Sequence, residues 1–247
     1  MSNKINKIQN ELRDFILKEL RFNLREAFKN GTLNRSTINE AGLRSIICNE
    51  LRKWFIKRTK IKIFTREEST IYFRREEKIK TCQPDIEIYH YPNQKKLNAI
   101  ENFDEREIIA FGEIKLWGAA DWFDYFERYS HSVTGYPKSW FSKSRKNYWN
   151  EEDLPSNTRL RGLFKDLYHL RLYSDPNLWT ALKTQKKSVP KHQRKIPLRF
   201  FIYCAVKRHY PIFKVANNIM DKREYDGKFG IKVPKSRRGF VRCYIRI

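Results

Sequence analysis

The feature that most restricts the fold is a glutamate and a lysine inside an otherwise apolar segment in the middle of the chain. Residues 107–116 read EIIAFGEIKL, which is typical of a buried β-strand. Side chains two positions apart on a strand share a face, so Glu113 and Lys115 project together while Ile114 faces the opposite, apolar layer. A buried carboxylate or ammonium is costly unless it is paired or binds a cation. The segment therefore predicts a strand that carries a polar site.

A further carboxylate is predicted beside this pair. Pro84-Asp85 is the only Pro-Asp dipeptide in the chain, and Asp85 begins a second predicted strand that runs to Tyr89. If the two strands are neighbours in register, Asp85, Glu113 and Lys115 converge on one point. Two carboxylates at that distance repel each other, and a divalent cation is the usual remedy. The alternative is an ordinary cross-strand pair of Glu113 and Lys115 beside a turn aspartate.

These donors favour a hard cation. Carboxylate, main-chain carbonyl and water oxygens suit Mg²⁺ or Mn²⁺ better than zinc. Such a cation polarises a phosphoryl oxygen and lowers the pKa of water, and Lys115 would position that water or neutralise developing charge. The constellation thus predicts phosphodiester hydrolysis.

A third acid, Glu50, is predicted to face the sheet from a helix. Ile46 and Ile47 precede it by four and three residues, and Trp54 follows it by four, so Glu50 lies in an apolar stripe. An unpaired carboxylate there would be costly. We expect Glu50 to be a further metal or water ligand. The alternative is a residue at the rim of the helix that pairs with a basic neighbour such as Lys53.

The periodicity elsewhere predicts helices and strands in succession, and hence an α/β fold. A capping box, Thr37-Ile38-Asn39-Glu40, is predicted to start the helix that carries Glu50. We expect a single domain, 1–247, with a mixed central β-sheet flanked by helices, an aromatic and basic insertion at about 117–150, and a C-terminal helix and hairpin at 207–247. The expected helices are 4–29, 37–58, 160–173 and 210–222, and the expected strands are 61–65, 70–74, 85–89, 107–116, 198–206 and 240–247.

The chain is strongly basic, with 52 Lys and Arg against 28 Asp and Glu and a net charge of +24. Such a charge favours a polyanionic partner, and nucleic acid leads over an acidic protein or an anionic membrane. The longest apolar run, Phe200 to Val206, is far shorter than the roughly 20 residues that span a bilayer. The N-terminal sequence does not read as a secretory signal and the four cysteines are widely spaced, so we expect a cytoplasmic protein with reduced thiols. The cations expected to contact nucleic acid are Lys165, Lys186, Lys187, Lys191, Arg194, Lys195, Arg237 and Arg238.

Together, the helix glutamate, the Pro-Asp strand and the Glu-x-Lys strand resemble the core of the PD-(D/E)xK nuclease superfamily, over roughly residues 37–206. The resemblance implies a restriction-endonuclease-like fold and a Mg²⁺-dependent site in which Mn²⁺ can substitute. It implies that Asp85, Glu113 and the main-chain carbonyl of Ile114 bind the metal. Lys115 would assist the nucleophile, and Glu50 would match the family's helix acid.

The resemblance also implies a function. We expect an endonuclease that acts on double-stranded DNA, first a restriction or other defence-type deoxyribonuclease and second a junction-resolving or transposon endonuclease. A homodimer is expected because cutting both strands commonly uses two active sites. Two alternatives stay open: a nuclease directed at RNA, and a nucleic-acid-binding protein without catalysis whose nuclease core is degenerate.

Overall fold

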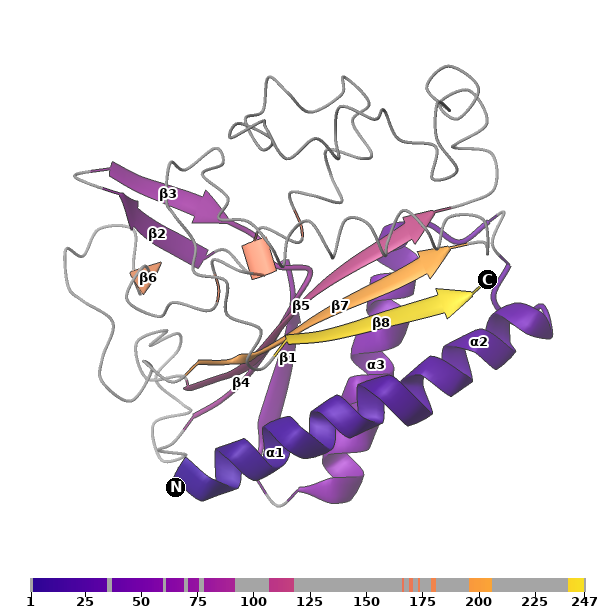
Figure 1. Ribbon diagram of the computed structural model, residues 1–247, viewed down its shortest axis with the longest axis horizontal. Helices are drawn as coiled ribbons and strands as arrows, with labels where there is room; N and C mark the ends of the chain where they lie inside the picture. Colours follow the sequence, from indigo (N-terminus) through magenta and orange to yellow (C-terminus); the bar gives the residue numbers. More distant parts are fainter. Residues whose placement is uncertain are drawn as a thin grey trace, which may run out of the picture.

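A five-stranded mixed β-sheet forms the centre of the protein, with the strand order β1-β4-β5-β7-β8 (Figure 1). Strand β4 pairs antiparallel with both β1 and β5, and β7 pairs parallel with both β5 and β8. The expected α/β class with a mixed sheet is therefore confirmed. The strands are β1 (Ile63–Glu67), β4 (Ile86–His90), β5 (Glu107–Trp117), β7 (Leu198–Ala205) and β8 (Phe240–Arg246).

The computed structural model describes residues 2–34, 37–59, 61–68, 71–75, 78–91, 107–117, 166, 169–170, 173, 179–180, 196–205 and 240–246. The expected insertion after Trp117 and the helix expected at 210–222 lie outside these residues. Of the helix expected at 160–173, the structure describes Asp166, His169 and Leu170 as helical and Tyr173 as a turn.

A second, smaller sheet contains the strand that was expected at 70–74. That strand, β2 (Ile71–Arg75), does not join the central sheet, but pairs with β3 (Lys78–Cys82) and β6 (Trp179–Thr180). Figure 1 shows the β2–β3 hairpin extending away from the central sheet. Neither β3 nor β6 was predicted, because β3 contains two lysines and a single large apolar residue and β6 is too brief to carry a pattern.

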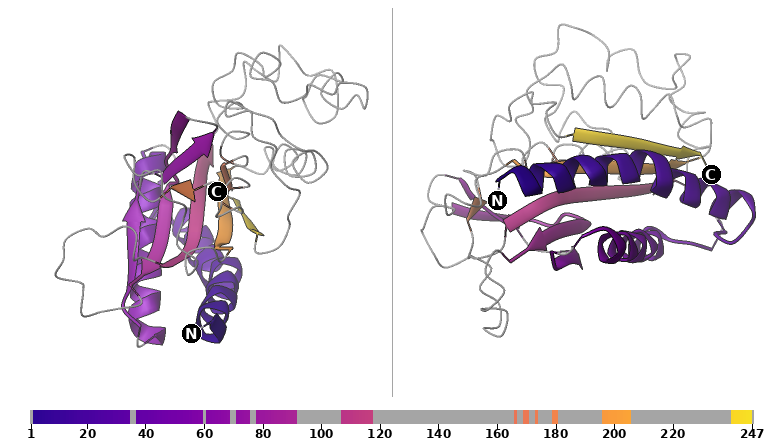
Figure 2. Two further views of the ribbon diagram at one scale, coloured as in Figure 1. Left: turned by 90° about the vertical axis from the view of Figure 1, so that its left-hand side faces the viewer. Right: turned by 90° about the horizontal axis from the view of Figure 1, so that it is seen from below.

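Helices cover one face of the central sheet. The helix expected at 4–29 consists of α1 (Ser2–Phe15), a π-helical turn η1 (Ile16–Leu20) and α2 (Arg21–Lys29), and runs roughly along β5 and β8 (Figures 1 and 2). Beside it lies α3 (Glu40–Arg58), whose Trp54 ring stacks on Phe15 with a centroid distance of 5.0 Å. None of the described helices is long and apolar enough to span a membrane.

The start of α3 differs from the expected capping box. Asn39 is the N-cap, and its side-chain oxygen accepts a hydrogen bond of 2.7 Å from the amide of Gly42. The Thr37 hydroxyl instead donates to the carbonyl of Asn34. Asparagine is a strong N-cap residue, so the carboxylate of Glu40 is not used for capping and reaches the sheet.

The two faces of the central sheet differ in chemistry. Ile86 lies opposite Gly112 on the helix side, and the next pair, Glu87 opposite Phe111, therefore belongs to the other side. The helix side is an apolar core in which Leu12, Leu20, Ile47 and Leu51 of the helices pack with strand residues such as Ile114 and Phe200. The other side carries charged side chains that are almost fully buried, among them Glu87, Glu113 and Arg199.

Candidate active site

Among the residues that the structure describes, no strand pairs with the second half of β5 on the edge that faces β4. Strand β4 pairs with β5 only as far as Ile86 opposite Gly112, whereas β7 continues along the other edge to Trp117. Two side-chain carboxylates take the place of the missing strand. Asp85 Oδ2 accepts a hydrogen bond of 2.6 Å from the amide of Ile114, and Glu40 Oε2 accepts one of 3.1 Å from the amide of Leu116. Because buried backbone donors need acceptors, both carboxylates contribute to holding the strand in place.

Glu113 lies between other acidic groups and is only 3% exposed. Burial raises the pKa of Glu113 well above its usual range, and the carboxylates of Asp85 and Asp166 raise it further, while Lys115 opposes them. The hydroxyl of Tyr173 donates a hydrogen bond of 3.3 Å to Glu113 Oε1. Repulsion between these carboxylates is the condition that a bound cation would relieve.

Lys115 is held by two carboxylates from different helical segments. Its Nζ lies 2.9 Å from Asp166 Oδ2 and 3.2 Å from Glu40 Oε1. Burial lowers the pKa of Lys115, but Asp166 and Glu40 outweigh it, so the net change is upward. The raised pKa favours the protonated, positively charged form of Lys115 at neutral pH.

Arg44 brings a second cation to the site. It follows Glu40 by one turn of α3, and its Nη1 lies 3.0 Å from Asp85 Oδ1. Its Nη2 lies 2.7 Å from Glu68 Oε1 and its Nε 3.5 Å from Glu67 Oε2, at the end of β1. Burial lowers the pKa of Arg44, and these three carboxylates raise it by more.

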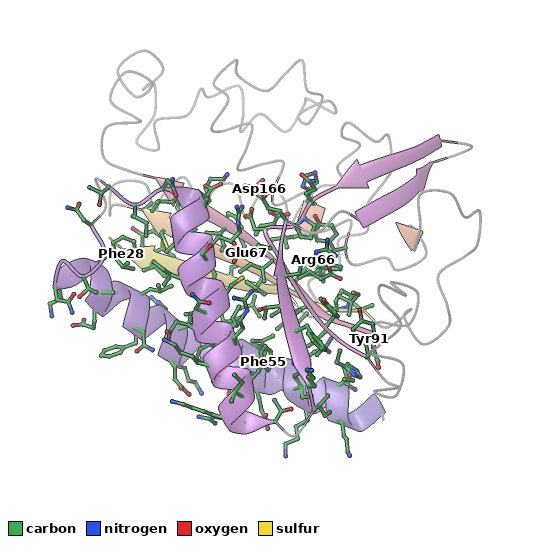
Figure 3. The ribbon with its side chains drawn as sticks, turned by 180° about the vertical axis from the view of Figure 1, so that it is seen from behind. Phe28, Phe55, Arg66, Glu67, Tyr91 and Asp166 are labelled. Atoms are coloured by element: carbon green, nitrogen blue, oxygen red, sulfur yellow. The ribbon has the colours of Figure 1, made fainter. Side chains whose placement is uncertain are left out.

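Sequence reasoning did not find the group formed by Asp166, His169 and Tyr173. Asp166 pairs with Lys115, and His169 Nδ1 lies 3.7 Å from Glu113 Oε1, the same oxygen that Tyr173 contacts. Figure 3 shows Asp166 and Glu67 beside the first half of α3, with Phe55 near the other end of that helix. Asp166, His169 and Tyr173 follow one another by three and four residues, a spacing that places side chains on one face of a helix. This spacing was the signal in the sequence that could have identified the group.

Asp85, Glu113 and Lys115 come together as expected, and Glu50 does not join them. Its carboxylate pairs with Lys53 Nζ at 2.9 Å, which is the alternative that the sequence left open. The expectation of an active-site Glu50 is corrected because Glu50 follows Glu40 by ten residues, about 15 Å along the helix axis. The helix acid that reaches β5 is Glu40.

The cations expected to contact nucleic acid are not placed by the structure. All eight lie outside the described residues: Lys165, Lys186, Lys187, Lys191, Arg194, Lys195, Arg237 and Arg238.

The oxygen donors at the candidate site suit Mg²⁺, but the metal would compete with Arg44 for Asp85. Asp85 and Glu113 supply carboxylate oxygens, and the carbonyl of Ile114 shares the open edge of β5 with its amide. Within the described ranges, no group of three or more His, Cys, Asp or Glu side chains is arranged to hold a metal ion. Asp85 Oδ1 already accepts from Arg44 and Oδ2 from Ile114, so a cation would have to compete with the charge of Arg44 for this carboxylate.

The chain matches no protein-family model, no curated protein and no solved structure.

Proposed function

We propose that the protein is a Mg²⁺-dependent endonuclease that hydrolyses the phosphodiester bonds of DNA. One observation carries the proposal: the carboxylate of Asp85 is hydrogen-bonded to the amide of Ile114, between Glu113 and Lys115. Asp85, which precedes Glu113 by 28 residues in the sequence, is thereby brought to the edge of the strand that carries Glu113 and Lys115. Such a set supplies both the oxygen donors for a hard cation and a positive charge for a phosphate.

The finer fold assignment, a restriction-endonuclease-like domain, belongs to this proposal. It is supported by a mixed sheet whose antiparallel half ends beside the candidate site and whose parallel half continues past it. It is also supported by the order of helix acid, Pro-Asp strand and Glu-x-Lys strand, with Glu40 in the position that was expected for Glu50.

In the proposed reaction, Asp85, Glu113 and the Ile114 carbonyl would hold Mg²⁺. When bound, Mg²⁺ would supply charge stabilisation at the phosphoryl oxygens and lower the pKa of a coordinated water. Lys115 remains protonated, so its contribution is electrostatic: it attracts the scissile phosphate and stabilises the negative charge that develops there. Asp166 and Glu40 fix the direction of its ammonium.

The net charge of +24 supports a nucleic-acid partner, for which we propose double-stranded DNA. A restriction or other defence-type deoxyribonuclease is the first choice, and a junction-resolving or transposon endonuclease the second. Cleavage of both strands would use a homodimer with two such sites.

A second candidate function is a nucleic-acid-binding protein without catalysis. The observation that favours it is that Asp85, Lys115 and Glu40 all satisfy groups of the protein itself, including two amides of β5. In that case the acids would be structural, and binding of nucleic acid would be indifferent to divalent cations.

A cleavage panel decides between the two. Purified protein would be incubated with duplex, branched and single-stranded DNA and with RNA, with Mg²⁺, Mn²⁺ or EDTA, and compared with Asp85→Asn and with the matched surface variant Glu50→Gln. Metal-dependent cleavage that is lost in Asp85→Asn and kept in Glu50→Gln is expected. Tight binding of nucleic acid with no cleavage under any condition would instead establish the binding protein.

A further inference from the structure

Arg44 places a positive charge on the carboxylate of Asp85, where it would repel a cation bound at the candidate site. Its guanidinium lies 3.0 Å from Asp85 Oδ1, while Asp85 Oδ2 is used by the amide of Ile114. The Arg44 side chain is only 11% exposed, so this contact is shielded from water and salt. The arrangement leaves Asp85 neutralised by the protein itself.

Two more carboxylates hold Arg44 from the opposite side. Glu68 Oε1 lies 2.7 Å from Nη2, and Glu67 Oε2 lies 3.5 Å from Nε. The side chains of Glu67 and Glu68 are 29% and 61% exposed, against 15% for Asp85. A guanidinium that left Asp85 would therefore still have two anionic partners, which are nearer to solvent.

The backbone at Glu68 supports this arrangement. Glu68 has φ of +50°, the left-handed region that non-glycine residues rarely adopt, and it is the one non-glycine residue with positive φ among those described. Its amide donates a hydrogen bond of 3.2 Å to the carbonyl of Asp85. The chain thus adopts an unfavourable conformation at the position where Glu68 reaches Arg44 and Asp85 together.

We propose that Arg44 is a built-in competitor of the divalent cation, which neutralises Asp85 in the metal-free protein and moves onto Glu67 and Glu68 when the metal binds. The inference rests on the cation site of the proposed nuclease and goes beyond it. Arg44 is here a positioning residue, because it contacts Asp85 and none of the reacting atoms. Its presence weakens metal binding by the free energy needed to break its contact with Asp85.

The first test is calorimetric titration of the purified protein with Mn²⁺, without nucleic acid. Arg44→Gln removes the competing charge and should bind Mn²⁺ about 10-fold more tightly than the wild type. Arg52→Gln is the matched control, since Arg52 also joins α3 to β1 but does so through Thr65. Its affinity for Mn²⁺ should equal that of the wild type. Equal or weaker binding by Arg44→Gln would overturn the proposal.

A conservative variant keeps the test decisive if Arg44→Gln does not fold. Lysine retains the charge but lacks the planar fork that contacts several carboxylates at once. Arg44→Lys should therefore bind Mn²⁺ more tightly than the wild type and less tightly than Arg44→Gln. An affinity of Arg44→Lys at or below that of the wild type would also overturn the proposal.

A double-mutant cycle tests the receiving carboxylates. Glu67→Gln combined with Glu68→Gln should weaken Mn²⁺ binding about fivefold, since Arg44 would have no alternative partner. In the Arg44→Gln background the same pair of substitutions should have little effect. Equal effects in both backgrounds would mean that Glu67 and Glu68 attract the metal directly, and would overturn the displacement of Arg44.

The outcomes separate this inference from the proposed function. Tighter Mn²⁺ binding by Arg44→Gln without any cleavage of nucleic acid would support the competitor and reject the nuclease. Metal-dependent cleavage together with unchanged Mn²⁺ affinity in Arg44→Gln would support the nuclease and reject the competitor.

Discussion

Glu40 and Lys115, 75 residues apart in the sequence, form an ion pair of 3.2 Å that joins the first turn of α3 to β5. The same carboxylate accepts a hydrogen bond from the amide of Leu116, so one side chain anchors both the backbone of the strand and the ammonium of Lys115. The candidate site is therefore also a structural junction, and variants of its acids should change both stability and activity.

The clearest test of this junction compares two glutamates of the same helix. Glu40→Ala leaves the amide of Leu116 without its acceptor and should lower the free energy of unfolding by about 1–3 kcal/mol. Glu50→Ala removes an ion pair whose lysine is 68% exposed, and should cost less than about 1 kcal/mol. Urea denaturation followed by circular dichroism measures both. Equal losses in the two variants would contradict the assignment of Glu40 as the helix acid.

Two substitutions of Asp85 should separate its contribution to stability from its contribution to catalysis. In Asp85→Asn the side-chain oxygen can still accept the hydrogen bond from Ile114, so the fold should be largely retained, whereas Asp85→Ala leaves that amide unpaired and should cost about 1–3 kcal/mol more. Both variants remove a charged oxygen donor, and we expect each to lower metal-dependent cleavage by about 100-fold or more. Asp85→Asn with wild-type cleavage would reject Asp85 as a metal ligand.

The sequence was sufficient to predict most of the central sheet. The apolar run of β7 and the EIIAFGEIKL segment of β5 each have a pattern that favours a buried strand, and both strands end within one residue of the expected ranges. The pairing of β4 with β5 was expected because it would bring Asp85 close to Glu113. The structure shows this pairing. The strand β2 was identified but its partners were not, because local periodicity does not specify which sheet a strand joins.

The sequence predicted the part of the candidate site that two neighbouring strands supply, namely Glu113 and Lys115 on β5 and Asp85 just before β4. Alternation along β5 fixes Glu113 and Lys115 on one face, whatever surrounds them. Which acid of the helix reaches the site depends on how α3 crosses the sheet and on where β4 ends. The sequence around Glu50 therefore fitted the role of the helix acid as well as the sequence around Glu40 did. Arg44 reaches the site from α3 with no local pattern to mark it, whereas Asp166 was marked only by its spacing to His169 and Tyr173.

Gly112, which precedes the Glu-x-Lys motif, should be intolerant of any side chain. A Cβ at position 112 would overlap the ring of Phe200, its neighbour across β5 and β7. Because Phe200 is fully buried, the ring has little room to move, and Gly112→Ala should lower stability by about 1–3 kcal/mol. Adding Phe200→Leu should recover part of this loss, as measured by urea denaturation of both single variants and the double variant. Additive losses would contradict the close packing.

The buried thiols should be unreactive in the native protein. Burial raises the pKa of Cys48 and of Cys243 to about 12, and that of Cys204 is raised as well. Since the thiolate is the nucleophile, iodoacetamide at pH 8 should label these three cysteines far more slowly than in guanidinium chloride. Peptide mapping by mass spectrometry measures the difference. Rapid labelling of any of the three in the native protein would contradict its burial in the core.

Asp166 should make the protein less stable as the pH rises from 4 to 7. Burial raises the pKa of Asp166 from its ordinary value of 3.8 to about 7, although the ammonium of Lys115 opposes the shift. Between these two values the folded state binds more protons than the unfolded state, so the free energy of unfolding falls as the pH increases. Glu113 has a raised pKa for similar reasons and adds to the same trend.

Asp166→Asn isolates the contribution of Asp166 to this trend. Asparagine does not titrate, so the variant should show a shallower fall in the free energy of unfolding between pH 4.5 and about 7 than the wild type. Urea denaturation at intervals of half a pH unit measures both profiles, and Glu50→Gln, which alters an acid outside the site, should reproduce the wild-type slope. Parallel profiles for Asp166→Asn and the wild type would mean that Asp166 stays ionised throughout. Its ion pair with Lys115 would then outweigh the cost of its burial.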